Sequence, residues 1–289
     1  MGYFFAIFLI PTVLLLLALV MIHFGFRVPR NPEKADPGRL GLPFRTLSIP
    51  TVSDKHLFGW LLPVSGASST MVILHGWGGN AEQMLPMALP FHEAGINVLL
   101  VDARNHGRSD RGGFSSLPRF AEDLENVIDW FRQNYPEHSR RIALLGHSVG
   151  GGAVLLAASR RRDVDAVISV SAFAHPRWMM ERYLRGAHIP AFLSAFVIRY
   201  VEWVIGYRYE EIAPLNTVCD IKCLILLVHG KADRTVPIED ALAIRQGCRQ
   251  SNIRLLTVDD AGHESVEKIH EQKGALLKFL RDSGFAVSG

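Results

Sequence analysis

The sequence predicts an α/β fold with a mainly parallel sheet and helices on both faces of that sheet. Short apolar runs typical of buried strands alternate along the chain with segments of helical periodicity. Such alternation favours parallel strands that are joined by helices packed on both faces. About 245 residues follow a polar N-terminal linker, which is enough for one large domain with a sizeable core.

The expected elements begin with a hairpin and continue as alternating strands and helices. The hairpin joins residues 46–50 to residues 56–63. The remaining strands are predicted at 71–74, 97–101, 142–145, 166–170, 224–228 and 253–258, and the helices at 81–94, 117–134, 149–159, 238–249 and 264–282.

One stretch, about residues 172–220, interrupts this alternation and is predicted to be a helical insert. It has no strand signal and is rich in aromatic residues, and several apolar side chains recur at helical spacing: Ile189, Phe192, Phe196, Tyr200 and Val204. Two interpretations stay open. The aromatic side chains either pack the insert onto the main domain, or they line a cap over the active site for an apolar acyl or lipid substrate.

The motif Gly146-His147-Ser148-Val149-Gly150 carries the strongest chemical signal. It follows an apolar strand and precedes a run of small residues, so Ser148 is expected at the apex of a sharp strand-to-helix turn. Glycine is needed around such a strained turn because larger side chains would not fit. The helix N-terminus behind the serine favours a developing negative charge. Ser148 is therefore the candidate nucleophile.

A nucleophilic serine needs a base and a group that orients the base, and two downstream loops supply them. Asp233 follows the strand 224–228, and His263 follows the strand 253–258. Loops at the carboxyl ends of parallel strands are where open α/β sheets place their ligands. Asp259 and Asp260 are alternatives to Asp233, but they directly precede the histidine loop and are interpreted as turn and surface residues.

Four other histidines occur beside glycine or serine in these motifs. His75 and His229 are expected to hold loop backbones at the edge of the sheet. The side chain of His147 is expected to point away from the serine and to have a packing role, whereas His106 could line the pocket.

Taken together, these motifs resemble those of the α/β hydrolases, in the lipase, esterase and serine-aminopeptidase-like group. The resemblance extends from about Phe44 to the C-terminal helix and includes the order Ser148, Asp233, His263. Further matching segments are His75-Gly76-Trp77-Gly78, which is similar to an H-G-x-G loop, and the D-x-R-x-H-G-x-S stretch at residues 102–109. The resemblance implies an oxyanion hole formed by the backbone N–H groups of Val149 and Trp77.

The N-terminal 26 residues predict a transmembrane anchor. No Asp, Glu, Lys or Arg occurs there, and Tyr3 to Ile22 is almost wholly apolar, about the 20 residues that a spanning helix requires. A signal peptide is disfavoured, since a basic n-region and a small-residue cleavage site are missing. Residues 27–43 are expected to be a polar linker. Its basic residues, Arg27, Arg30, Lys34 and Arg39, predict that the domain lies on the cytoplasmic side of the membrane.

Composition bears on the partners, cofactors and compartment that the sequence predicts. The net charge of +3 is too small to indicate a nucleic-acid partner. Neither a metal nor another cofactor is expected, because His263-Glu264 lacks the second histidine of an H-E-x-x-H site. Cys219 and Cys223 are interpreted as small apolar fillers rather than a disulfide, and the odd count of 3 cysteines weakly favours a reducing compartment.

The predicted function is a membrane-anchored serine hydrolase that cleaves carboxylic esters of small or acyl-chain substrates through an acyl-enzyme. Thioester or peptide hydrolysis by the same residues is the first alternative. A non-catalytic protein of this fold, binding a ligand through the insert, is the second. The complete set of Ser148, Asp233 and His263 favours the enzyme. The sequence leaves the oligomeric state open.

Overall fold

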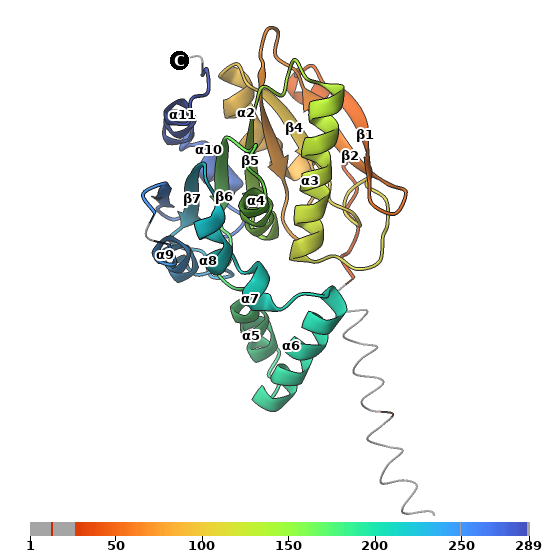
Figure 1. Ribbon diagram of the computed structural model, residues 1–289, viewed down its shortest axis with the longest axis vertical. Helices are drawn as coiled ribbons and strands as arrows, with labels where there is room; N and C mark the ends of the chain where they lie inside the picture. Colours follow the sequence, from red (N-terminus) through yellow and green to blue (C-terminus); the bar gives the residue numbers. More distant parts are fainter. Residues whose placement is uncertain (1–12, 14–26, 249, 288–289) are drawn as a thin grey trace, which may run out of the picture.

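The computed structural model describes residue 13, residues 27–248 and residues 250–287, and it contains a central sheet covered by helices (Figure 1). The described residues form an eight-stranded sheet in the order β1-β2-β4-β3-β5-β6-β7-β8. β2 is antiparallel to both β1 and β4, and all other neighbouring strands are parallel. The predicted hairpin and mainly parallel sheet are confirmed. The strands are β1 Arg45–Thr51, β2 Lys55–Leu62, β3 Ser69–Leu74, β4 Asn97–Val101, β5 Arg141–His147, β6 Ala166–Val170, β7 Leu224–Gly230 and β8 Ile253–Val258.

Helices cover both faces of the sheet, as expected. One buried apolar cluster lies under α3 and α4, and a second lies under α2, α10 and α11. The central strands are buried along their whole length because both faces are covered, which explains their continuous apolar runs. The helices are α2 Leu85–Glu93, α3 Leu117–Asn134, α4 Val149–Arg160, α5 Pro176–Gly186, α6 Ala191–Ile205, α7 Tyr209–Ile212, α8 Pro214–Thr217, α9 Ile238–Gln246, α10 Val266–His270 and α11 Lys273–Asp282.

Three predicted helices have different limits. The helix expected at 81–94 is α2, Leu85–Glu93, preceded by a 3-10 turn at Glu82–Met84. The helix expected at 264–282 is two helices, α10 and α11, because the chain turns at Glu271 and Gln272. The helix expected at 238–249 ends at Gln246 and is capped by Gly247, whose N–H bonds to the carbonyl of Ala243. Helix ends of this kind depend on local turns that periodicity does not resolve.

The insert between β6 and β7 is helical, as predicted. α5 and α6 project together beyond one edge of the sheet, and α7 and α8 lead the chain back to it (Figure 1). Only a few side chains of α6 are buried, among them Ile198 and Glu202. We call residues 172–220 the cap.

The linker is more ordered than a simple tether. Arg30 donates hydrogen bonds from Nε to the carbonyl of Gly107 (2.6 Å) and from a terminal nitrogen to that of Ser109 (2.8 Å). Asn31 donates to the carbonyl of Gly78 at 3.1 Å. Residues 30–34 are therefore fixed against the loops that follow β3 and β4.

The interpretation of Cys219 as an apolar filler is wrong. Cys219 forms a disulfide with Cys248, 29 residues further along the chain. Cys219 precedes β7 and Cys248 follows α9, so the two meet only after these elements fold together; spacing alone could not reveal this. Cys223 is a free, partly buried thiol whose pKa burial raises to about 11, as expected for a small filler.

Apart from Val13, the predicted anchor, Tyr3 to Ile22, lies outside the described residues. Among the residues that are described, no helix combines the length and the apolar character needed to span a membrane.

Candidate active site

Ser148 occupies a strained turn between β5 and α4. Its backbone has φ 55° and ψ −116°, a conformation that non-glycine residues rarely adopt. The turn is held because Ser148 N donates to the carbonyl of Val170 (2.8 Å), while its own carbonyl accepts from Gly152 N (3.0 Å). Strain that the surrounding structure maintains in this way is typical of functional sites.

The two glycines of the motif are required by close backbone approach. A Cβ atom at Gly146 would lie 2.1 Å from the carbonyl oxygen of Gly150, and one at Gly150 would lie 2.4 Å from that of His75. Both distances are well inside van der Waals contact. The glycines therefore let α4 start directly behind the serine and let the loop after β3 pass beside it.

Ser148, His263 and Asp233 form a row in which each side chain lies within hydrogen-bonding distance of the next. Ser148 Oγ is 2.9 Å from His263 Nε2, and His263 Nδ1 is 2.8 Å from Asp233 Oδ2. A carboxylate can only accept, so Nδ1 carries the proton and Nε2 is free to accept from the serine. The three side chains come from loops after β5, β8 and β7, as the sequence analysis expects.

Asp233 is held in its charged form. Burial alone would raise its pKa, but the hydrogen bond from His263 and those from backbone N–H groups outweigh burial and lower it. Oδ1 accepts from Thr235 N (3.0 Å) and Val236 N (2.8 Å), leaving Oδ2 for the imidazole. In contrast, Asp259 is exposed and pairs with Lys231, 2.7 Å away.

His147 does more than the packing role expected of it. Its Nε2–H donates to the backbone carbonyl of His263 at 2.8 Å, and the two rings lie 5.1 Å apart. Burial, followed by the neighbouring His263, lowers its pKa and keeps it neutral. His147 thus fixes the loop that carries His263. Sequence reasoning missed this contact because it joins residues that are far apart in the chain.

The other histidines support loops. His75 donates to the carbonyl of Gly76 (2.6 Å) and accepts from Ala103 N (3.1 Å), and burial lowers its pKa to about 3. His229 donates to the carbonyl of Val236 (2.8 Å), beside Asp233. His106 is fully buried against His75 and Phe120 rather than exposed in the pocket.

The loop after β3 passes close to the serine. A Cβ atom at Gly76 would lie 3.1 Å from Ser148 Cβ, so the peptide leading to Trp77 runs beside the nucleophile. Val149 is the first residue of α4, and the first N–H groups of a helix have no partner within it. Two backbone donors, those of Trp77 and Val149, therefore flank Ser148.

A cavity of about 380 Å³, which we call the apolar cavity, lies between Ser148 and the cap. None of the residues that line it is charged. The cap contributes side chains from α5 and α6 to its wall, among them Met179, Met180, Val201 and Ile205.

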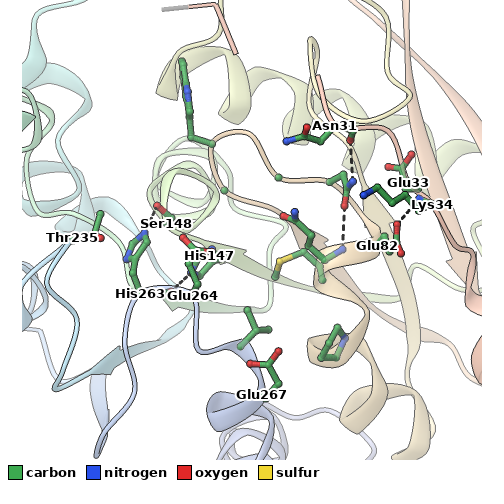
Figure 2. Close-up of a pocket in the computed structure, with 18 of the residues that line it drawn as sticks. Asn31, Glu33, Lys34, Glu82, His147, Ser148, Thr235, His263, Glu264 and Glu267 are labelled. Atoms are coloured by element: carbon green, nitrogen blue, oxygen red, sulfur yellow. Dashed lines mark hydrogen bonds between the residues drawn. The ribbon is translucent and has the colours of Figure 1, made fainter. Parts of the chain in front are cut away.

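A larger cavity of about 790 Å³, which we call the polar cavity, opens on the other side of Ser148 (Figure 2). Ser148, His147 and His263 lie at one end, and the linker residues Glu33 and Lys34 lie at the other.

The periodic aromatic residues of the cap take neither of the two expected positions. Phe192 is 75% exposed, Phe196 is 44% exposed and Tyr200 is half-buried, and none of the three lines either cavity. The neighbouring Trp203 is 77% exposed. α6 is apolar on several faces, and it turns Val201 and Ile205 inward instead. Periodicity identifies a helix but cannot choose the inward face of a helix that is apolar all round.

Comparisons with known proteins identify the family and the fold of the chain. The family model described as serine aminopeptidase, S33, matches residues 66–210. The uncharacterised protein YfhR of Salmonella typhimurium is 24% identical, over 96% of this chain and 94% of its own length.

Solved structures of esterases have the same fold. The esterase Pf2001 of Pyrococcus furiosus superposes with a TM-score of 0.76 at 26% identity, covering 90% of this chain and 98% of its own. Est1E of Butyrivibrio proteoclasticus, solved with ferulic acid bound, gives a TM-score of 0.63 at 22% identity, covering 81% of this chain and 99% of its own; at that identity the likeness concerns the fold.

Proposed function

Because the chain belongs to the serine aminopeptidase S33 family of the α/β hydrolases, and is thus an enzyme of the hydrolase class, we propose that it is a serine hydrolase that cleaves carboxylic esters of apolar acyl groups. Ser148 is the nucleophile, His263 the general base and acid, and Asp233 the group that orients His263. The support is the pair of hydrogen bonds of 2.9 and 2.8 Å that links the three side chains.

In the first half of the reaction, Ser148 Oγ attacks the ester carbonyl carbon while its proton passes to His263 Nε2. The carbonyl oxygen becomes an oxyanion, which the N–H groups of Trp77 and Val149 stabilise. When the carbon–oxygen bond to the alcohol breaks, His263 gives the proton to the departing oxygen. Water then attacks the acyl-enzyme, gives a proton to His263, and the acid leaves as the proton returns to Ser148.

The observation that favours an ester over a peptide is the uncharged wall of the apolar cavity. An aminopeptidase must hold the charged α-amino group of its substrate near the nucleophile, and a charge in an apolar site needs a partner. When the acyl half of the substrate, which carries that amino group, lies in the apolar cavity, none of the lining residues could provide a partner, whereas an aliphatic acyl chain would fit there.

The test is hydrolysis of p-nitrophenyl octanoate by the purified protein, together with labelling by a fluorophosphonate. We expect Ser148→Ala to lower kcat by about four to six orders of magnitude and to abolish labelling, with the fold intact by circular dichroism. Ser159→Ala, at the far end of α4, is the matched control. Hydrolysis by Ser148→Ala at the wild-type rate would refute the proposal.

We also propose that residues 3–22 anchor the enzyme in a membrane. The support is the uncharged, apolar sequence of about 20 residues. Recovery of the full chain in the membrane fraction after carbonate washing tests it; release by carbonate would refute it.

The side of the membrane on which the domain lies is a separate question. The Cys219–Cys248 disulfide is typical of oxidising compartments. This finding weighs against the cytoplasmic side predicted from the basic residues of the linker, and we therefore do not propose that side. Protease treatment of intact cells decides it, since only an outward-facing domain would be digested.

A further inference from the structure

The two cavities meet at Ser148 but differ in their relation to His263. Ser148, Trp77 and Tyr183 line both of them. His263 and its supporting neighbour His147 line only the polar cavity, whereas Val149 lines only the apolar cavity. The site is therefore asymmetric about the nucleophile.

Given the proposed function, this asymmetry indicates which cavity holds the acyl half of an ester and which holds the alcohol half. His263 must give its proton to the oxygen of the departing alcohol, so the alcohol has to lie on the side of His263. The acyl chain then extends in the other direction, past Val149 and under the cap. The alcohol consequently occupies the polar cavity.

The far wall of the polar cavity is the N-terminal linker, and that wall is fixed. The backbone N–H of Lys34 donates to Glu82 at 2.6 Å, and the carbonyl of Asn31 accepts from Asn80 at 2.9 Å. These contacts join the linker to the loop and helical turn that follow β3, which also form part of the cavity. Figure 2 shows Asn31, Glu33, Lys34 and Glu82 grouped at the end opposite Ser148.

The charged side chains that line the polar cavity would disfavour binding of an anionic alcohol. Four glutamates line it, of which Glu33 keeps its carboxyl oxygens buried near Asp102, and Lys34 is the one lysine or arginine among the lining residues. Glu264 and Glu267 lie on the side of the cavity nearest to His263, and Glu33 and Glu82 lie on the linker side (Figure 2). An alcohol that carries hydroxyl groups or a positive charge would find acceptors here, whereas a phosphate or sulfonate would be repelled.

We infer that linker residues 31–34, together with Glu82, Glu264 and Glu267, form a leaving-group subsite, and that the substrates are apolar acyl esters of polar, non-anionic alcohols. The inference rests on the proposed function, since it takes the direction of proton transfer from His263. It adds a specific role for a segment that precedes the hydrolase motifs.

The first experiment compares four esters with the same octanoyl group: 1-octanoylglycerol, octanoylcholine, octyl octanoate and 3-sulfopropyl octanoate. All four give the same acyl-enzyme, so differences in kcat/KM report the alcohol alone. We expect the glycerol and choline esters to be cleaved with kcat/KM about tenfold higher than the other two, a difference worth about 1.4 kcal/mol. Equal values for all four, or preference for the sulfonate, would overturn the inference while leaving ester hydrolysis intact.

The second experiment removes one charge. Glu267→Gln should lower kcat/KM for octanoylcholine about two- to fivefold more than for 1-octanoylglycerol, as expected for one exposed charge, because glutamine keeps an acceptor oxygen for hydroxyl groups. Glu137→Gln, in the turn before β5 and outside both cavities, is the matched control. An unchanged choline-to-glycerol ratio in Glu267→Gln would overturn the electrostatic part of the inference.

The third experiment loosens the linker. Asn31→Ala removes the hydrogen bond to Gly78, so we expect both polar esters to lose activity while octyl octanoate does not. Equal losses for the polar and the apolar esters would mean that the linker only supports the fold. If no ester is cleaved even by the wild type, the proposed function itself fails, and this outcome is distinct from the others.

Discussion

The proposed catalytic side chains and the walls of the two cavities meet at Ser148, yet they are held in different ways. Ser148, Asp233 and His263 lie on short loops after β5, β7 and β8, whose backbones are fixed by the parallel ladder. The cavity walls include, besides loops of the sheet domain, side chains of the cap and the linker, and these two segments lie outside the sheet (Figure 1). The proposed chemistry therefore depends on the sheet, whereas the choice of substrate can change in peripheral segments without disturbing that chemistry.

The largest effect should come from the sheet-borne group that orients His263. Asp233→Asn replaces an acceptor for Nδ1–H with an amide and favours the wrong tautomer of the imidazole. We expect kcat to fall by about two to four orders of magnitude, measured with p-nitrophenyl octanoate.

Asp259→Asn and Asp260→Asn are the matched controls, and both should retain nearly full activity. Asp259 is exposed. The backbone of Asp260 forms a turn with φ 53°, and asparagine adopts this backbone conformation readily. If Asp260→Asn were the most damaging of the three, Asp233 would not be the orienting residue.

The positions of the loops after β5, β7 and β8 also explain why the sequence alone could bring Ser148, Asp233 and His263 together as a candidate site. Each catalytic candidate lies within a few residues of the end of a strand, so a local motif fixes both its place in the sheet and its neighbours. The strained turn at Ser148 needs Gly146 and Gly150, and these residues leave a visible pattern in the sequence. His147 was misjudged because its partner, the carbonyl of His263, comes from a distant strand end.

A smaller effect is expected from the cap side of the site. Val201 lines the apolar cavity, so Val201→Trp should fill part of it and shorten the longest acyl chain that fits. We expect kcat/KM to fall about tenfold for a decanoyl ester and to change little for an acetyl ester, as is usual when a pocket loses room for a few methylenes.

Leu193→Trp is the matched control, because Leu193 lies on the same helix but is exposed and lines neither cavity. An equal loss for acetyl and decanoyl esters in Val201→Trp would place the acyl chain elsewhere.

The pH dependence of stability should report the contact between Glu33 in the linker and Asp102 at the end of β4. Asp102 is fully buried, and its pKa is raised first by burial and then by the facing carboxyl of Glu33. Since the folded pKa lies above the unfolded value, the folded state binds more protons between the two, and stability falls as the pH rises through this range. Asp102 also accepts hydrogen bonds from the backbone N–H groups of Ala81 and Arg108, which offset part of this rise in its pKa. The guanidinium of Arg30 bonds to the neighbouring carbonyl of Gly107.

Glu33→Gln removes the negative charge that faces Asp102. Its melting temperature should therefore fall less between about pH 4 and pH 8 than that of the wild type, and at pH 8 it should exceed the wild-type value by about 2 °C. Thermal melts followed by circular dichroism measure this, with Glu137→Gln as the control. Parallel curves for the variant and the wild type would show that Glu33 does not act on Asp102.

The features that the sequence did not predict share one physical cause. The packing of the linker, the Cys219–Cys248 disulfide and the inward face of α6 all depend on contacts between segments that are distant in the chain. Periodicity and spacing describe one segment at a time. The strands could be predicted because burial on both faces makes each of them apolar throughout, whichever neighbours it has.

The smallest effect is expected on the outer face of the cap, where the aromatic residues lie. Phe192 and Trp203 are largely exposed and line neither cavity, so Phe192→Ser and Trp203→Ser should leave kcat/KM for dissolved octanoyl esters within about twofold of the wild type. Val201→Ser, on the inner face of the same helix, should instead reduce the preference for long acyl chains. A tenfold loss in Trp203→Ser on a dissolved ester would mean that the outer aromatic residues turn toward Ser148 during turnover. The cap would then have to rotate on the sheet when substrate binds, and the apolar cavity described above would be only one of its two arrangements.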